Sequence, residues 1–206
     1  MATTEKRVTK RRAETRQRLL DAASEAFAEE GFGRSTVEKV CERGGYTRGA
    51  FYSNFASLDE LFLAMWTQRS GELLDGIRTA LEGELENVRD VHAVVRRLVG
   101  AIPIDDAWYR ITAEFTAHAL RTPPLRDVMA ARENAIIATL IPIIESHLKK
   151  VGRTVPDPVA LVQALIAVHD GTIVQCLIEP DNPAAFERRI NLFTRVVLAY
   201  STEGTK

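Results

Sequence analysis

Helix-start and helix-stop signals follow one another so closely between residues 31 and 60 that only short helices fit between them. Gly31 suits the C-cap position of a first helix. The apolar face of that helix repeats at helical spacing and consists of Leu19, Leu20, Ala23, Ala26 and Phe27. Ser35 and Glu38 then match a capping box, which predicts a second helix that begins at Ser35 and stops at Gly44.

The stretch YTRGAFYSNF, residues 46–55, predicts a third and still shorter helix. Phe51 and Phe55 lie four residues apart, so both can be buried against the first two helices at a gain of about 2 to 3 kcal/mol each. Arg48 and Tyr52 fall on the adjacent row. Two short helices joined by a glycine-containing turn form a helix-turn-helix, whose second helix enters the major groove of DNA. The alternative is a plain three-helix subdomain with an exposed tyrosine.

If this segment binds DNA, each of its polar residues can be assigned a specific contact with a base or a phosphate. Arg48 can donate two hydrogen bonds to O6 and N7 of a guanine. Gly49 weakens a helix by about 1 kcal/mol relative to alanine, but its bare backbone can approach the duplex closely. At the start of the second helix, Thr36 and the free N–H groups can hold a phosphate. Hydroxyl donors for other phosphate oxygens are Thr47, Tyr52 and Ser53.

The segment from Leu19 to Leu61 resembles the N-terminal domain of the tetracycline-repressor (TetR/AcrR) family of bacterial transcriptional regulators. The residues at that family's spacings are Ala22, Ala23, Phe27, Gly31, Phe32, Thr36, Val37, Gly45, Gly49, Tyr52 and Phe55. The resemblance implies base-facing or groove-facing positions for Arg48, Gly49, Tyr52 and Asn54. It implies phosphate contacts for Thr36, Thr47, Tyr52 and Ser53. The chain departs from the family pattern at Leu58, where a phosphate-contacting lysine is usual, and at Ala50 and Asn54.

Charge is distributed unevenly along the chain, although the formal net charge is only −1. Residues 1–18 hold seven Lys and Arg against two Glu, a net charge of +5, and the sum through residue 56 is +3. The basic end therefore indicates a polyanion partner for the N-terminal part only. We expect an arm over residues 1–18, including Arg11 and Arg12, to reach the minor groove or the flanking backbone. A solvated tail with no partner is the alternative.

Longer helices are expected beyond this segment. Ser57 and Glu60 form a capping box that starts the first of them, while Asp157 and Asn182 each precede a proline suited to a first helical turn. Pro142 is expected to kink or split its helix. The expected elements cover residues 58–82, 88–101, 106–121, 124–151, 158–179 and 184–201.

No strand pattern accompanies these elements, so we predict an all-α fold of about nine helices. Its first part is a three-helix domain over residues 10–56 that contains the helix-turn-helix. Its second part is a larger helical bundle over residues 57–206.

The last two long helices carry apolar residues on more than one face. One face can serve the core of the chain and the other a partner, giving a two-fold four-helix interface. The residues assigned to that interface are Val162, Ile166, Ile173, Phe186, Ile190, Phe193 and Val197. Core packing in a monomer is the alternative. A dimer also suits DNA, because its two recognition helices can meet successive major-groove turns, about 34 Å apart, on a palindromic operator.

Residues 114–126 and 169–171 resemble the same family more weakly, and this resemblance implies a ligand-binding and dimerisation domain. The residues expected to line its cavity are Trp66, Trp108, Phe115, His118, Met129 and His169. Such walls are mainly apolar, and the residues expected as polar anchors are Arg110, Glu114 and Asp170. A hydrophobic or aromatic effector is therefore expected. The alternative is that the aromatic residues are ordinary core and the histidines are structural hydrogen-bonding residues.

Several classes of protein are disfavoured by the sequence. It contains no GxSxG, P-loop or HExxH motif and no His/Cys/carboxylate cluster, so we expect no catalysis, no metal and no cofactor. Cys41 and Cys176 do not suggest a disulfide framework and are expected to be small buried residues. No continuous apolar run approaches the roughly 20 residues of a membrane span, and we expect a cytoplasmic location.

The expected function is that of a ligand-responsive repressor that binds a palindromic operator as a homodimer. A small effector would favour a conformation whose recognition helices no longer match the operator, and DNA affinity would fall. An activator or constitutive regulator without an effector predicts the same DNA contacts and is the alternative.

Overall fold

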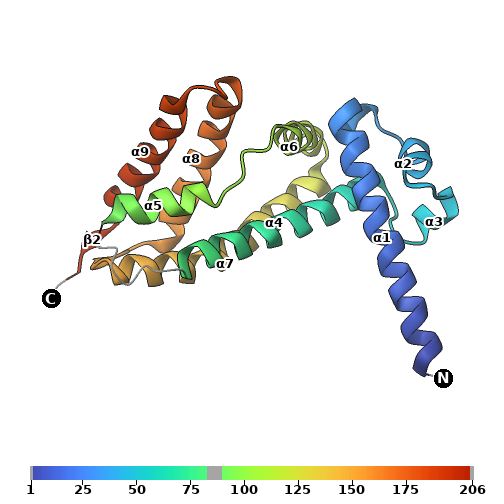
Figure 1. Cartoon of the computed structure of the whole chain (residues 1–206), viewed down its shortest axis with the longest axis horizontal. Helices are drawn as coiled ribbons and strands as arrows, with labels where there is room; N and C mark the ends of the chain where they lie inside the picture. The colour runs from blue at the N-terminus through green and yellow to red at the C-terminus, as the bar shows by residue number, and fades with distance from the viewer. Residues whose placement is uncertain (1, 83–89, 205–206) are drawn as a thin grey trace. The chain divides into compact units, whose positions relative to one another are not determined.

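The computed structural model describes residues 2–82 and 90–204, and most of these residues are helical (Figure 1). In this part of the chain the α-helices are α1 Ala2–Glu30, α2 Val37–Gly44, α3 Arg48–Tyr52, α4 Leu58–Glu82, α5 Val91–Gly100, α6 Asp106–Ala119, α7 Pro123–Lys150, α8 Pro158–Ile178 and α9 Pro183–Ala199. A short 3-10 helix, η1, covers Phe32–Arg34. The predicted all-α class with about nine helices is confirmed. The predicted start of one helix at residue 88 lies outside the described residues.

Two short strands were not predicted from the sequence. β1 (Arg153–Thr154) and β2 (Thr202–Glu203) pair antiparallel, with Arg153 opposite Glu203. Each strand is two residues long, so neither can show the alternation by which a strand is recognised. The guanidinium of Arg153 also donates to the hydroxyl of Ser201 (2.7 Å) and to its carbonyl (2.6 Å), which fixes the chain after α9.

Two compact units make up the chain, and each is built from segments distant in sequence. Unit 1 consists of Met1–Arg69 and Ala107–Pro123, and unit 2 consists of Ser70–Asp106 and Pro124–Lys206. The first part of α4 and nearly all of α6 therefore belong with the N-terminal helices. This division differs from the boundary after residue 56 that we expected, because aromatic residues of α4 and α6 complete the core of unit 1.

Phe32 lies at the centre of that core. Its ring meets Phe27 of α1 and Phe115 of α6 edge to face, each at a centroid distance of 5.1 Å. Phe62 of α4 stacks on Phe115 at 3.7 Å. Aromatic pairs of this kind contribute about 0.5 to 1.5 kcal/mol beyond the burial of their apolar area. The turn that carries η1 is therefore held from α1, α4 and α6 together.

Most of the predicted helix caps are present. Thr47 accepts a hydrogen bond from the Ala50 N–H (3.2 Å), and Ser57 accepts one from the Glu60 N–H (3.1 Å). Before α8 and α9, capping side chains precede prolines as predicted, and these are Asp157 and Asn182. Pro142 lies inside α7, which continues as one helix.

The predicted cap of α2 was wrong by one residue. Thr36 is the N-cap and accepts from the Lys39 N–H (3.3 Å), so α2 begins at Val37. Ser35 instead donates its hydroxyl to the carbonyl of Gly31 (2.9 Å) and closes the preceding turn. Adjacent hydroxyl residues offer the same capping chemistry, and the backbone conformation selects between them.

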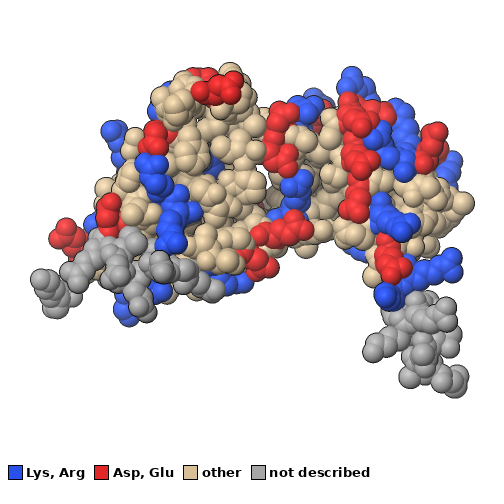
Figure 2. Space-filling view, in the orientation of Figure 1, with Lys and Arg blue, Asp and Glu red and all other residues tan. Residues whose placement is uncertain are grey.

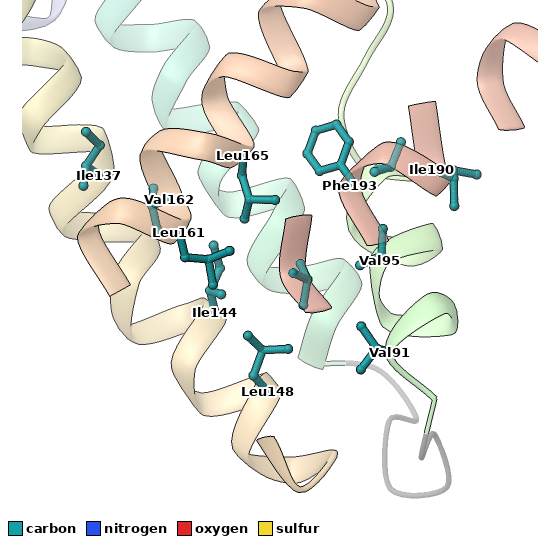
Figure 3. Packing of buried hydrophobic residues seen from close by; sticks show 12 residues of the cluster. Val91, Val95, Ile137, Ile144, Leu148, Leu161, Val162, Leu165, Ile190 and Phe193 are labelled. Atoms are coloured by element: carbon teal, nitrogen blue, oxygen red, sulfur yellow. The ribbon is translucent and has the colours of Figure 1, made fainter. Parts of the chain in front are cut away.

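Helices α5, α7, α8 and α9 form the core of unit 2 (Figure 3). Buried aliphatic side chains converge from all four helices, including Val95 of α5, Ile144 of α7, Leu161 of α8 and Ile190 of α9. α8 lies along α9. α8 is also long and apolar enough to cross a membrane by length and composition. Leu161, Val162 and Leu165 of α8 are buried in the unit 2 core.

Replacing Gly31 by alanine should destabilise the fold more than the same change at Gly45. Both glycines have positive φ, but Gly31 (φ 86°, ψ 151°) lies in a region open almost only to glycine, which costs an L-residue about 1 to 3 kcal/mol. Gly45 (φ 70°, ψ 35°) is left-handed helical, which costs roughly 1 to 2 kcal/mol. An added Cβ at Gly31 would lie 2.7 Å from a carboxylate oxygen of Glu114, whereas at Gly45 no described atom lies within 4 Å. In urea unfolding, Gly31→Ala should therefore lower the free energy of unfolding by about 1 kcal/mol more than Gly45→Ala does. Equal losses would contradict the packing described for η1.

Candidate nucleic-acid interface

Two buried phenylalanines fix α3 against the rest of unit 1. The side chains of Phe51 and Phe55 are 0% and 1% exposed, as the four-residue spacing predicted. Their rings lie 5.9 Å apart, and Tyr52 meets Phe51 edge to face at 5.4 Å. Tyr52 itself remains 50% exposed. The apolar row of α3 is thus inside, and the neighbouring row faces outward.

The N-terminal basic segment is part of α1, not a separate arm. Residues 2–18 contain neither glycine nor proline, so nothing in them interrupts the helix. Arg12 donates to the carbonyl of Ser53 at the end of α3 (3.0 Å), and the guanidinium of Arg16 lies 4.3 Å from the ring centroid of Phe55. Arg11 is exposed. Two arginines of α1 therefore brace α3 from outside.

Six of the residues predicted to meet DNA are exposed, and they lie in α3 or at the caps of α2 and α3. They are Thr36, Thr47, Arg48, Gly49, Tyr52 and Ser53. An added Cβ at Gly49 would approach only the Thr47 hydroxyl, at an ordinary contact distance of 3.7 Å. The fold itself therefore does not require a glycine at this position.

Asn54 does not have the groove-facing position predicted for it. Its amide nitrogen donates to the carbonyl of Ala50 (2.8 Å) and contacts the hydroxyl of Ser53 (3.2 Å). Its amide oxygen is buried and has no hydrogen-bond partner among the described residues. The side chain folds back on the last turn of α3, where free carbonyl groups compete for its donors.

Arg48 is held from two sides by residues of unit 1. Its Nη1 atom lies 2.9 Å from Oε1 of Glu38 in α2, and its guanidinium lies 5.9 Å from the ring centroid of Tyr52. Hydrogen bonding to Tyr52 and the charge of Glu38 raise the pKa of Arg48. Hydrogen bonds from its own N–H and from Thr36 lower the pKa of Glu38, with a further contribution from Arg48. The sequence pattern assigns Glu38 only to a capping box and gives no sign of this pair, because the packing of α2 against α3 brings the two residues together.

The surface around the helix-turn-helix carries charges of both signs (Figure 2). Arg43 of α2 forms an ion pair with Glu29 of α1, with Nη1 and Oε1 2.9 Å apart, and Lys39 pairs with Glu30. These two cations are thus partly neutralised within the protein. The candidate site therefore depends on a few positioned donors and not on a uniformly basic face.

Comparison with known proteins assigns this arrangement to a family. A model described as bacterial regulatory proteins, tetR family, matches residues 19–65. A model described as BetI-type transcriptional repressor, C-terminal, matches residues 87–199, more than half of the chain. The chain belongs to the TetR family. Both matched models describe bacterial transcriptional regulators.

The relatives of this chain include an activator and a repressor of transcription. The HTH-type transcriptional activator FasR of Mycolicibacterium smegmatis is 32% identical over 103 residues, which cover 50% of this chain and 47% of FasR. The HTH-type transcriptional repressor AcnR of Corynebacterium diphtheriae is 27% identical over 160 residues, 77% of this chain and 78% of AcnR. The match to FasR thus spans about half of its length.

A solved structure of the multidrug binding protein EbrR complexed with imidazole is also similar. It has a TM-score of 0.61 and 25% sequence identity, and the match covers 89% of each chain.

The six predicted effector contacts of this TetR-family chain fall in both units. Trp66, Trp108, Phe115 and His118 belong to unit 1, and Met129 and His169 belong to unit 2. Phe115 is 0% exposed and serves as core. His118 lies 3.1 Å from a carboxylate oxygen of Asp59 and packs on Phe32, which is a structural role.

The two tryptophans of that group remain partly exposed next to the aromatic core. The ring of Trp108 stacks on Phe62 at a centroid distance of 6.0 Å, and the guanidinium of Arg69 lies over the Trp108 ring, 5.1 Å from its centroid. Trp66 lies 6.3 Å from Phe62. These indoles are the members of the predicted set that combine an aromatic face with access from outside the core.

Two of the residues expected as polar anchors connect α6 to the N-terminal helices instead. Glu114 accepts a hydrogen bond from the Gly33 N–H (3.4 Å), and Arg110 donates to the carbonyl of Ala28 (3.3 Å). Sequence spacing gave no sign of these contacts, since α6 and η1 are some 80 residues apart in the chain. The third, Asp170, lies on α8, where the residue is exposed although neighbouring atoms desolvate its carboxyl group and raise its pKa.

Most of the predicted dimer-interface residues are covered by their own chain. Val162, Ile190, Phe193 and Val197 lie in the unit 2 core and are at most 5% exposed, and Ile173 is 9% exposed. They are therefore not available to a partner in this conformation. The large apolar side chains that α8, α9 and the residue after α9 do expose are Val159, Ile178, Leu192, Leu198 and Tyr200.

His169 accepts a hydrogen bond inside unit 2 and so has a structural role. Arg189 of α9 is 1% exposed, and its guanidinium donates to Nδ1 of His169 (2.7 Å) and to the hydroxyl of Thr172 (2.9 Å). Burial and the charge of Arg189 lower the pKa of His169 to about 4. Nearby, desolvation and Glu133 raise the pKa of Asp170, against the opposing charge of Arg189.

Lowering the pH from about 7.5 to about 5 should weaken the fold through His169. His169 binds a proton near pH 6.5 in the unfolded chain but only near pH 4 in the folded chain. Its contribution to the free energy of unfolding therefore falls by about 2 kcal/mol over this pH range. Asp170 acts in the opposite sense, because its folded pKa is raised. His169→Asn keeps an acceptor for Arg189 but cannot titrate. Urea unfolding at both pH values should show that the free energy of unfolding falls less for this variant than for the wild type. An equal fall would contradict the role given to His169.

Proposed function

We propose that this TetR-family protein is a ligand-responsive repressor that binds a palindromic operator as a homodimer. A small hydrophobic or aromatic effector releases it from DNA. The observation that carries the proposal is the exposed row of Arg48, Gly49 and Tyr52 above the buried pair Phe51 and Phe55. Such a row supplies a bidentate donor for a guanine, a bare backbone and a phosphate donor within one helical turn.

We assign residues 10–56 to DNA reading and residues 57–206 to effector binding and dimerisation. Within residues 1–18, Arg12 of α1 braces α3. The exposed Arg11 is assigned to the minor groove or the flanking backbone. Thr36, Thr47 and Ser53 serve as phosphate donors at the ends of α2 and α3. The site needs no metal or cofactor, because DNA recognition uses only hydrogen bonds, charge and shape.

Homodimerisation draws support from the apolar side chains exposed on α8 and α9. Ile178 is 74% exposed, Leu192 is 42% exposed and Leu198 is 44% exposed. Exposed apolar area on two neighbouring helices is typical of a surface covered by a second pair of helices. With two copies, the recognition helices can meet successive major-groove turns, which accounts for a palindromic operator.

Effector response draws support from the partly exposed indoles of Trp66 and Trp108, which offer flat apolar surfaces. EbrR, at 25% identity, is named a multidrug binding protein and was solved with imidazole. To release the operator, an effector must favour the conformation without DNA affinity by several kcal/mol. A location in the cytoplasm, where the DNA is, follows from this function.

The competing function is an activator or a constitutive regulator without an effector, and the match to the activator FasR favours keeping it. Both functions use the same DNA contacts. They differ in the response to small molecules, since only a ligand-responsive regulator has compounds that raise its melting temperature and also weaken operator binding.

DNA binding by the purified protein to the region upstream of its own coding sequence tests the proposal. Fluorescence anisotropy should show binding that weakens steeply with salt, because Lys and Arg contacts release counterions. Arg48→Ala should reduce operator affinity by about 10-fold or more, from the loss of a bidentate base contact. Gly49→Ala should leave the protein folded, since the added Cβ has room, yet weaken operator binding. Salt-insensitive binding, or binding unaffected by Arg48→Ala, would refute the proposed function.

A further inference from the structure

Glu38 brings a negative charge to the surface expected to face DNA phosphates. Its Oε1 atom lies 2.9 Å from Nη1 of Arg48, and the two side chains are 55% and 62% exposed. Glu38 lies in the first turn of α2, and Arg48 is the first residue of α3. The pair therefore bridges the two helices of the helix-turn-helix at its outer surface, where Tyr52 is also exposed.

This ion pair limits the conformations of an otherwise flexible arginine. An exposed arginine has about 2 kcal/mol of rotamer entropy to lose. Phosphate oxygens are the most numerous acceptors on a duplex, and a contact to them carries no sequence information. Glu38 on one side and the Tyr52 ring, 5.9 Å from the guanidinium, on the other restrict where Arg48 can point. A guanidinium held in this way is pre-positioned for one base edge.

The carboxylate also competes with DNA phosphates for Arg48. While Arg48 is paired with Glu38, it is less free to contact a phosphate oxygen, and such contacts are offered by any sequence. A base edge in the operator is reached by Arg48 in its paired position, whereas a phosphate contact elsewhere requires it to leave Glu38. The pair therefore penalises non-operator DNA more than the operator, and specificity often depends on such a difference.

We propose that Glu38 is a specificity-determining residue, which positions Arg48 for a base edge and opposes phosphate contacts with non-operator DNA. The proposal rests on the DNA-binding function proposed above. Glu38 touches Arg48 and is not itself assigned a contact to a base. Its effect is therefore expected in the ratio of operator affinity to non-operator affinity.

Glu42 provides a matched control within the same helix. It lies one helical turn beyond Glu38, on the same face of α2, and it is exposed. Its carboxylate forms no ion pair among the described residues. Glu42→Gln thus makes the same change of charge without disturbing Arg48.

The test compares full-length wild type, Glu38→Gln, Glu42→Gln, Arg48→Ala and the Glu38→Gln/Arg48→Ala double variant. Affinities for an operator duplex and a scrambled duplex of equal length are measured at several salt concentrations. Glu38→Gln should lower the operator-to-scrambled affinity ratio about 3- to 10-fold, largely through tighter scrambled binding. Glu42→Gln should leave the ratio within about twofold of the wild type. The double variant should show the ratio of Arg48→Ala alone, because Glu38 acts through Arg48.

Three results would overturn the inference: an unchanged ratio in Glu38→Gln, an equal fall in Glu42→Gln, or multiplied effects in the double variant. Glu38 accepts hydrogen bonds from its own N–H and from Thr36. Thr36 is nevertheless the N-cap of α2, so folding is expected to survive in Glu38→Gln, and melting temperature checks this. Glu38→Asp gives a second variant that keeps the charge but shortens the reach to Arg48, and it should lower the ratio through weaker operator binding. If the wild type itself does not discriminate between the duplexes, the proposed function fails. If the wild type and Glu38→Gln discriminate equally, only this inference fails.

Discussion

Burial of Phe51 and Phe55 is the interaction on which the DNA-reading surface depends. α3 is five residues long, far below the roughly 12 to 15 residues at which an isolated helix becomes even marginally stable. Its structure must therefore come from packing, and each buried phenylalanine supplies about 2 to 3 kcal/mol. The contacts of Arg12 and Arg16 from α1 add support at the end of the helix. The stabilisation from these contacts explains how α3 tolerates Gly49, a poor helix former.

Electrostatics at this surface depends on position more than on total charge. Several cations near the helix-turn-helix are engaged by carboxylates of the same unit, as with Arg43 and Glu29 or Arg48 and Glu38. Such exposed pairs contribute little to stability, about 0 to 1 kcal/mol each. They do fix where the guanidinium groups lie. For a protein that must distinguish one DNA site from many, placing a donor matters more than adding one.

Local signals in the sequence were sufficient to predict the α-helices, although not all of their ends. Thr47 and Ser57 cap their helices because capping depends on spacing within a few residues, and Phe51 and Phe55 are buried because a four-residue repeat defines a face. Spacing could not separate Ser35 from Thr36 as a cap, since the choice belongs to the backbone conformation.

Features that depend on the packing of distant segments were not predictable in this way. The periodicity of α8 and α9 revealed two apolar faces but not which one points inward, so residues such as Ile190 and Phe193 were assigned to a partner although they lie in the core. The fully buried Arg189 was not anticipated, because an arginine in an amphipathic helix normally predicts exposure. The contact between Glu114 and Gly33 likewise joins residues far apart in the chain.

The central claim is that the outward row of α3 lies on the duplex while its phenylalanines remain inside. Backbone amide NMR signals of isotope-labelled full-length protein, followed during titration with an operator duplex, test this claim most directly. The account predicts that the largest changes occur at Arg48, Gly49 and Tyr52, with protection of the Phe51 and Phe55 amides from hydrogen exchange in both states. Changes concentrated in α5 to α9 with α3 unaffected, or loss of that protection on binding, would contradict it.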